Sequence, residues 1–176
     1  MSDYKIKKLI SGDEIQIRAK EMGRKIAGDF EGRPIHVVVV QLGAWMFGAD
    51  LIKNIPTNQL TLDSIQLSSY KGDTESCGLV TVVRDLVRRV KGQDVLVVED
   101  IVDTGRTISE LQKNLKRRGA ASVQVATMLN KQDGREIDFE PDYVGFEIQD
   151  CFVIGYGLDY QERFRNLPYV AEMVFC

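Results

Sequence analysis

The chain has 176 residues, of which 44% are hydrophobic and 28% are charged, and its net charge at pH 7 is −3. This composition is typical of a globular protein with one packed core, and it excludes a fibrous or disordered chain. The small negative net charge argues against a general nucleic-acid surface without excluding local basic patches. The longest apolar run, Val37 to Val40, is far too short to span a bilayer, so no membrane partner is expected.

The first half of the chain alternates helical and strand-like patterns. Ser11 and Glu14 have the spacing of a capping box, and apolar residues then recur at helical spacing as far as Ile26. The polar stretch 71–78 predicts a long loop between two strands. The expected strands cover 35–40, 63–70 and 79–86, and a helix is expected at 45–53.

The second half continues the alternation. A helix that includes Leu111 should end at Arg117-Arg118-Gly119, because basic residues suit the last turn and glycine suits the C-cap. The expected strands cover 95–98, 123–129, 143–146 and 152–155, with a turn at 132–134. Strands that alternate with helices predict an α/β fold with a mainly parallel central sheet flanked by helices, in a single domain 1–176.

The cysteines indicate the compartment. Cys77, Cys151 and Cys176 are odd in number and form no CxxC pair, so neither a disulfide framework nor a Cys-rich zinc site is expected. Such cysteine use fits a reducing environment. The first eight residues are polar and do not resemble a signal peptide. The expected location is the cytoplasm.

The segment Val97 to Thr107 carries the most specific chemistry. A buried strand leads into the adjacent carboxylates of Glu99 and Asp100, and Asp103 then precedes a small polar turn that opens a helix. Ligands of open α/β sheets gather beyond the carboxyl ends of the strands, and Gly105 at a helix N-terminus suits a phosphate. Carboxylates instead accept hydrogen bonds from hydroxyls and hold water on Mg²⁺. The segment therefore predicts a site for a phosphorylated sugar with free hydroxyls.

Other interpretations of this segment are weaker. A solvated turn capped by Thr107 and Glu110 would be preferred for a lone acidic pair, but the full segment between strand and helix reverses that preference. A P-loop is disfavoured because Asp100 stands at its first glycine and Arg106 at its lysine. No GxGxxG follows a strand, and the strand ending at Val40 is not followed by the acidic pair of a phosphoacceptor domain.

The segment 97–107 resembles the phosphoribosyl-pyrophosphate signature of type I phosphoribosyltransferases. Over nearly its whole length the chain is similar to the hypoxanthine-guanine phosphoribosyltransferase family. The further matching segments are Trp45–Leu51, Ser68–Tyr70, Asn130–Lys131, Val144–Ile148, Phe152–Tyr160 and Arg163–Pro168. The resemblance implies a small hood formed by the chain termini and late segments, a mobile flap at about 69–79, Mg²⁺ as cofactor, and a homodimer or homotetramer.

The resemblance also implies a reaction, in which 5-phosphoribosyl moves from phosphoribosyl pyrophosphate to N9 of hypoxanthine and/or guanine, giving IMP or GMP and pyrophosphate in purine salvage. Asp103 would be the general base near the purine N7. The ribose phosphate would be held by Glu99, Asp100, Thr104, Gly105, Arg106 and Thr107. The pyrophosphate loop and flap would contribute Leu42, Gly43, Ser69, Tyr70 and Arg165. The purine would be bound by Lys131, Phe152, Val153 and Asp159, and Mg²⁺ by Glu99, Asp100 and Asp159.

These implied roles are chemically consistent. The ammonium group of Lys131 donates but does not accept hydrogen bonds, so it favours an oxo group at purine C6 over the amino group of adenine. Taken alone, Lys131 and Arg165 would be solvated charges, and Phe152 would be a core aromatic as readily as a stacking one. The family match favours the site.

The chain departs from the family pattern at two positions. Leu42 stands where the pyrophosphate loop usually carries a basic residue. The resemblance implies that this loop acts through its backbone amides, in which case activity survives the loss of the basic side chain. Such a loop often contains a non-proline cis peptide. Lys71 stands where a glycine commonly follows the Ser-Tyr pair, and this could stiffen the flap hinge.

Two alternative functions remain open. One is a regulator that senses phosphoribosyl pyrophosphate and binds nucleic acid through a basic face, for which the candidates are Arg88, Arg89, Lys91, Lys116, Arg117 and Arg118. The other is a phosphoribosyltransferase for another base, such as xanthine, adenine or a pyrimidine. Asp103, Lys131 and Asp159 together favour catalysis on small-molecule substrates with no nucleic-acid partner.

Overall fold

The computed structural model describes residues 4–69 and 80–175, and its main layer is a six-stranded sheet in the order β4-β3-β2-β5-β6-β7. The neighbours from β3 to β7 pair in parallel, and β4 is antiparallel to β3. The strands are β2 (Ile35–Gln41), β3 (Leu60–Ser69), β4 (Val80–Arg84), β5 (Asp94–Val102), β6 (Ser122–Lys131) and β7 (Tyr143–Ile148). The predicted mainly parallel α/β sheet is confirmed.

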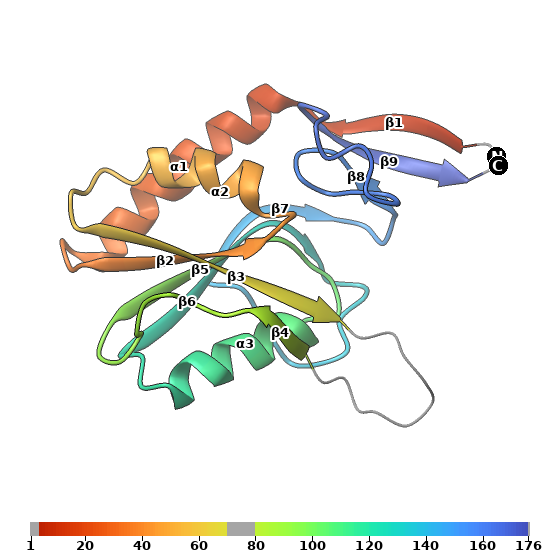
Figure 1. Cartoon of the computed structure of the whole chain (residues 1–176). Helices are drawn as coiled ribbons and strands as arrows, with labels where there is room; N and C mark the ends of the chain where they lie inside the picture. Colours follow the sequence, from red (N-terminus) through yellow and green to blue (C-terminus); the bar gives the residue numbers. More distant parts are fainter. Residues whose placement is uncertain (1–3, 70–79, 176) are drawn as a thin grey trace.

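Helices cover both faces of this sheet. α1 (Gly12–Phe30) and α2 (Trp45–Lys53) lie on one face, and α3 (Arg106–Arg117) lies on the other (Figure 1). Successive side chains of a strand point to opposite faces, so Val37 packs in the core under α1 and α2 while Val38 packs in the core under α3. This two-sided burial explains why β2 is apolar almost throughout.

The predicted capping box at the start of α1 is confirmed. The Glu14 backbone N–H donates to the Ser11 hydroxyl at 3.3 Å, and the Ser11 N–H donates to the Glu14 carboxylate at 2.8 Å. These two bonds satisfy donors that the first helical turn leaves free.

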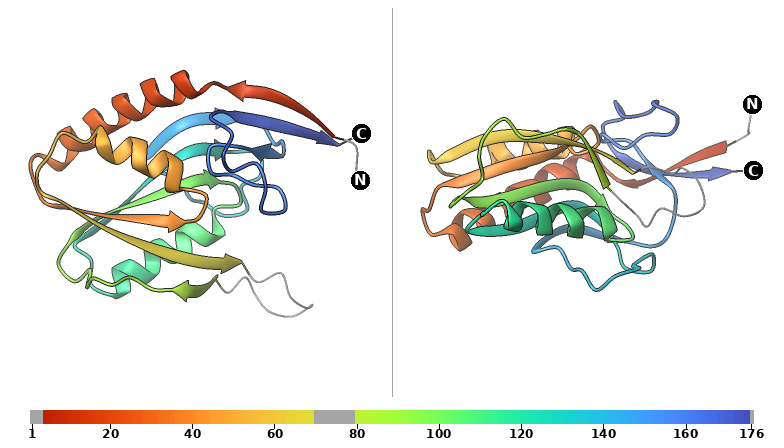
Figure 2. Two further views of the ribbon diagram at one scale, coloured as in Figure 1. Left: turned by 45° about the horizontal axis from the view of Figure 1, so that its top comes forward. Right: turned by 60° about the horizontal axis from the view of Figure 1, so that its bottom comes forward.

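A second, smaller sheet forms the predicted hood. It contains β1 (Tyr4–Ile10), β9 (Val170–Phe175) and β8 (Val153–Ile154) in the order β1-β9-β8, with antiparallel pairing. The start of β1 and the end of β9 lie beside one another, with Tyr4 opposite Phe175 (Figures 1 and 2). The sequence pattern did not predict β1 or β9 as strands.

Part of the sequence-based prediction falls outside the described residues. Of the predicted flap at 69–79, the structure describes only Ser69, the last residue of β3. Tyr70 and the rest of the flap lie outside the described residues, so the flap stays a prediction. Among the residues that are described, no helix is long and apolar enough to cross a membrane.

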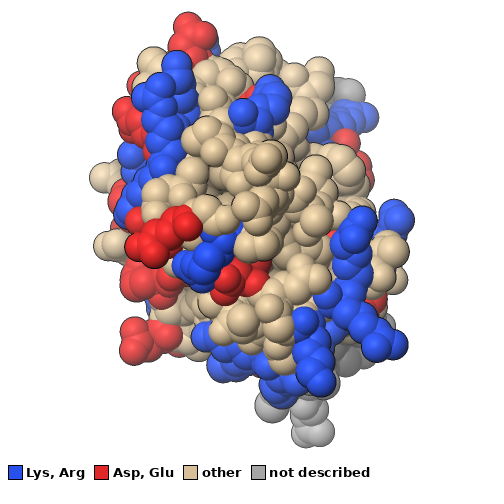
Figure 3. Space-filling model, turned by 90° about the vertical axis from the view of Figure 1, so that its left-hand side faces the viewer, with Lys and Arg blue, Asp and Glu red and all other residues tan. Residues whose placement is uncertain are grey.

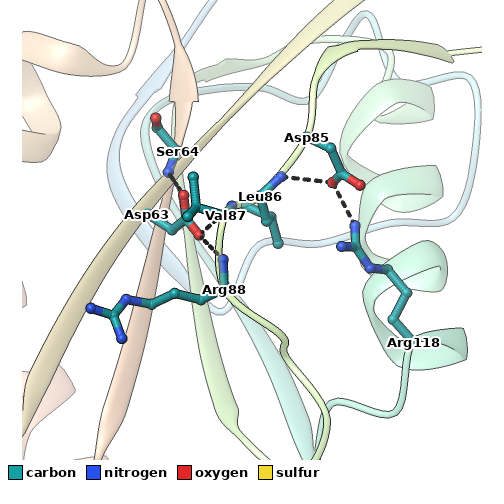
Figure 4. A network of polar contacts seen from close by, with 7 residues as sticks. All are labelled: Asp63, Ser64, Asp85, Leu86, Val87, Arg88 and Arg118. Carbon is teal, nitrogen blue, oxygen red and sulfur yellow. Dashed lines mark hydrogen bonds and ion pairs between the residues drawn. The ribbon is translucent and has the colours of Figure 1, made fainter.

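Two carboxylates fix the chain that follows β4 (Figure 4). Asp63 on β3 accepts hydrogen bonds from the backbone N–H groups of Val87 at 2.9 Å and Arg88 at 2.8 Å. Asp85 accepts a hydrogen bond from the guanidinium group of Arg118 at 2.7 Å. These bonds hold residues 85–88 between the edge of the sheet and the end of α3.

The face at the amino ends of the parallel strands carries charges of both signs around a largely uncharged centre (Figure 3). Two of the arginines proposed for a basic face are paired with acids, Arg117 with Glu110 and Arg118 with Asp85, each at 2.7 Å. This pairing reduces the basic character of the face that the alternative of a nucleic-acid-binding regulator would need.

Two glycines of α1 provide a matched test of the packing. A Cβ at Gly23 would lie 2.3 Å from the carbonyl oxygen of Asn54, whereas a Cβ at Gly28 would have no atom within 4 Å. Gly23→Ala should lower the free energy of unfolding by about 1–3 kcal/mol. Gly28→Ala should raise it by roughly 0.5–1 kcal/mol, because alanine is the better helix former. Urea unfolding measures both changes, and equal effects would contradict the close approach of α1 to the end of α2.

Candidate active site

The acidic pair lies near the carboxyl end of β5, in the middle of the sheet. Glu99 is only 8% exposed. The Glu99 carboxylate accepts a hydrogen bond from the backbone N–H of Asp100 at 3.1 Å. Burial, together with the neighbouring Asp100 carboxylate, raises the pKa of Glu99 well above its ordinary value. The strand continues to Val102, so the predicted strand 95–98 was too short and the pair lies within β5.

A pocket of about 110 Å³ opens where β5 leads into α3. Its lining consists of Glu99, Ile101, Val102, Asp103, Thr104, Gly105, Thr107 and Ile108. Gly105 is the N-cap of α3, with φ 81° and ψ −13°, a conformation that favours glycine. The N-cap glycine provides no side-chain cap, and the Arg106 N–H donates a long hydrogen bond of 3.4 Å to the Thr104 hydroxyl, so the predicted alternative of a Thr107–Glu110 capping box is wrong. The other amides of the first turn remain available to an anion.

The segment after β6 packs against this turn. The guanidinium group of Arg135 donates to the carbonyl oxygen of Asp103 at 3.1 Å, and the N–H of Glu136 donates to the carbonyl oxygen of Thr104 at 3.1 Å. Arg106 does not line the pocket, because its side chain forms an ion pair with Glu136. Arg135 was not identified from the sequence, and nothing in its spacing indicates the contact.

Lys131, at the end of β6, lies between two carboxylates. Its Nζ is 3.7 Å from the Asp103 carboxylate and 3.3 Å from that of Asp150, and the Lys131 side chain is only 8% exposed. The parallel register places Lys131 opposite Ile148 on β7, close in sequence to Asp150. The structure thus brings Asp103 and Lys131 together, and it adds Asp150, which the sequence did not indicate.

The loop after β2 lies between the acidic pair and the hood. Its Gln41–Leu42 peptide bond is cis, as the resemblance implies, and the Leu42 side chain is half-exposed. A Cβ at Gly43 would lie 1.6 Å from a carboxylate oxygen of Asp100, and a Cβ at Gly157 would lie 1.9 Å from the carbonyl oxygen of Gly43. The contact of Gly157 is with backbone and leaves no room for a methyl group, whereas a methyl group at Gly43 would displace the Asp100 carboxylate.

Asp159 and Arg165 form an ion pair on the hood side of this loop. Their oxygen and nitrogen atoms lie 2.6 Å apart, and Arg165 also donates to the carbonyl oxygen of Gly157 at 2.8 Å. Among the described residues, no three or more His, Cys, Asp or Glu side chains are grouped as a metal site. The predicted set Glu99, Asp100 and Asp159 therefore forms no ready-made protein cage for Mg²⁺.

Phe152 and Val153 lie where the chain enters the hood. Phe152 is 44% exposed, which fits a stacking surface better than the alternative of a core aromatic. Val153 is buried and begins β8. The ring of Phe152 has two aromatic neighbours, Tyr160 and Phe175.

The fold and this site are those of a phosphoribosyltransferase, and a family model described as the phosphoribosyl transferase domain matches residues 7–161. The hypoxanthine-guanine phosphoribosyltransferase of Bacillus subtilis is 45% identical over 167 residues, which cover 95% of this chain and 92% of that protein. The crystal structure of a hypoxanthine phosphoribosyltransferase from Staphylococcus aureus is similar with a TM-score of 0.89 and 42% identity, covering 94% of this chain and 90% of the other. The chain belongs to the hypoxanthine-guanine phosphoribosyltransferase family.

A longer relative contains a similar region. The bifunctional protein TilS/HprT of Listeria monocytogenes is 49% identical over 165 residues, which cover 94% of this chain and 25% of that protein. The chain thus spans about a quarter of the length of this relative.

The buried Glu99 should make stability depend on pH. A carboxyl group whose pKa is raised on folding stabilises the folded state below its unfolded pKa, and this contribution is lost as the pH rises through the folded pKa. Glu99→Gln should therefore raise the free energy of unfolding relative to the parent chain at neutral pH, and change it little below the ordinary glutamate pKa of about 4.3.

Glu110→Gln is the matched control. A hydrogen bond from Arg117 lowers the pKa of Glu110, so its contribution is present above the unfolded pKa and this variant should lose stability at neutral pH. Urea unfolding across this pH range measures both variants. A difference between Glu99→Gln and the parent chain that does not change with pH would contradict the raised pKa.

Proposed function

We propose that the chain transfers 5-phosphoribosyl from phosphoribosyl pyrophosphate to N9 of hypoxanthine and/or guanine, giving IMP or GMP and pyrophosphate in purine salvage. The observation that carries this proposal is the 3.7 Å approach of the Lys131 ammonium to the Asp103 carboxylate. O6 and N7 lie side by side on one edge of a 6-oxopurine. A donor beside a carboxylate matches that edge when O6 accepts a hydrogen bond and N7 carries a proton.

The ribose 5-phosphate fits the pocket between β5 and α3. Thr104 to Thr107 offer hydroxyls and helix N-terminal amides to the phosphate. Glu99 lines this pocket, and Glu99 and the adjacent Asp100 would accept hydrogen bonds from the ribose hydroxyls. Arg106, held by Glu136, would contribute its backbone amide rather than its guanidinium group.

The pyrophosphate would lie on the other side of the acidic pair, where the amides around Gly43 and the guanidinium group of Arg165 can meet its charge. Asp100 approaches this region from the sheet and Asp159 approaches it from the hood. Mg²⁺ usually binds through one or two carboxylates plus substrate phosphates, so the oxygens of these two residues are suitable ligands. The ion would offset charge on the leaving pyrophosphate. Arg165 would exchange Asp159 for the pyrophosphate when both ligands bind.

The base would stack on the exposed ring of Phe152, and the backbone of Val153 would pair with its edge. Stacking on Phe152 orients the purine so that N9 points toward the ribose while O6 and N7 point toward Lys131 and Asp103. The preference for hypoxanthine, guanine or xanthine depends on the groups that meet the purine 2-position, where Val153 and Asp159 are the candidates.

Asp103→Asn tests the assignment of the general base. The change should lower kcat by about 10²–10⁴-fold, the usual worth of general acid–base help, with a much smaller effect on KM. Steady-state kinetics with hypoxanthine measure this split, and Asp138→Asn, an exposed acid of the neighbouring segment, serves as control. An unchanged kcat in Asp103→Asn would remove this residue from the mechanism.

The alternatives are less well supported. A sensor of phosphoribosyl pyrophosphate would need neither a base nor a purine-edge donor, yet Asp103 and Lys131 adjoin in this chain. A transferase for adenine would meet an ammonium group where it needs an acceptor for its amino group. Transfer to xanthine remains compatible with these contacts, and the cytoplasmic location stays a prediction.

We also propose that the enzyme forms a homodimer or homotetramer through the face of α2 and β3. Three large apolar side chains of these elements are about half-exposed: Trp45 51%, Met46 47% and Leu62 54%. Trp45 and Leu62 also line a groove of about 540 Å³. Exposed apolar side chains gathered beside a groove are typical of an interface between subunits.

Leu62→Asp should convert the assembly to monomers, because a charge in the middle of such a face opposes its burial. Light scattering after size-exclusion chromatography measures the mass at micromolar concentrations. Ile17→Asp is the control, since Ile17 on α1 is 61% exposed and does not line this groove. A parent chain that is already monomeric would contradict the proposed assembly.

A further inference from the structure

The ring of Phe152 belongs to a cluster of three aromatic side chains. Its centroid lies 5.7 Å from that of Tyr160 and 5.9 Å from that of Phe175, with interplanar angles of 87° and 63°. Tyr160 and Phe175 also contact one another at 5.5 Å and 61°. Each ring therefore meets the other two at the steep angles that aromatic pairs favour.

The last strand also holds the backbone of Phe152. The N–H of Met173 donates to the carbonyl oxygen of Phe152 at 2.8 Å, and Val153 pairs with Glu172 of β9. Phe175 follows Met173 at a spacing of two, so both side chains point to the same face of β9. One strand thus restrains both the backbone and the ring of Phe152.

We propose that Phe175 and Tyr160 are positioning residues that set the orientation of the Phe152 ring for the purine base. A ring that already packs against two other rings loses little further freedom when a base stacks on it, and such preorganisation improves affinity. The C-terminal strand would then contribute to base affinity without touching the substrate. This inference rests on the proposed function, in which Phe152 stacks on the base.

Phe175→Ala should raise KM for hypoxanthine by roughly three- to tenfold, the usual worth of one aromatic pair. KM for phosphoribosyl pyrophosphate and kcat should stay close to the parent values, because the ring is not near the phosphate pocket. Phe175→Tyr keeps the ring and should restore the parent KM for the base. Val174→Ala alters the neighbouring, 41% exposed position of the same strand and should leave both KM values unchanged.

Phe152→Ala separates this inference from the proposed function. If Phe152→Ala raises KM for the base while Phe175→Ala leaves it unchanged, the positioning role is overturned and stacking stands. If Phe152→Ala has no effect on that KM, stacking itself is overturned. The double variant should match Phe152→Ala alone, because Phe175 acts through that ring, and additive increases would contradict the inference. Equal increases in both KM values for Phe175→Ala would indicate general damage to the hood and also overturn it.

Discussion

The close approach of Gly43 to Asp100 and Gly157 is the contact on which the site depends. It joins the central sheet to the hood at a point where Gly157 cannot carry a methyl group and a methyl group at Gly43 would displace the Asp100 carboxylate. Arg165 extends the connection, because it donates to the carbonyl oxygen of Gly157 and pairs with Asp159. The acidic pair on β5 and the charged pair of the hood are thereby held on opposite sides of one loop. This is the arrangement that a sugar phosphate with a leaving group on the far side requires.

The charged groups of the site neutralise one another in the chain itself. Lys131 lies between Asp103 and Asp150, and Asp159 lies beside Arg165. The Asp159–Arg165 pair is partly exposed, and pairs of this kind contribute little net stability, so a substrate anion can replace Asp159 at small cost. Lys131 is nearly buried, so a substrate atom that separates it from Asp103 must itself accept a hydrogen bond from its ammonium group. The purine edge would replace the direct contact between Lys131 and Asp103. The pyrophosphate would replace Asp159 as the partner of Arg165. The same pairs keep the side chains in position before the substrates bind.

Local rules predicted much of the fold. The capping box of α1 follows from side-chain chemistry within one turn, and the acidic segment identified the pocket through its strand-turn-helix context. The strands β1 and β9 were missed, because their pairing joins opposite ends of the chain, with Tyr4 opposite Phe175. The contact of Asp150 with Lys131 depends on strand register, and that of Arg135 depends on how a loop folds back. The pairing of Asp159 with Arg165 is a further contact that spacing in the sequence does not reveal.

The most direct test is the base preference of the purified protein in a steady-state ultraviolet assay. Phosphoribosyl pyrophosphate and Mg²⁺ would be supplied with hypoxanthine, guanine, xanthine or adenine in turn. Rapid nucleotide formation from 6-oxopurines, with little from adenine, is the result predicted from the adjoining Lys131 and Asp103. Equal turnover of adenine would contradict the assignment of Lys131 to the purine O6. No turnover with any base, in protein that still binds phosphoribosyl pyrophosphate, would contradict the proposed transfer and favour a sensor.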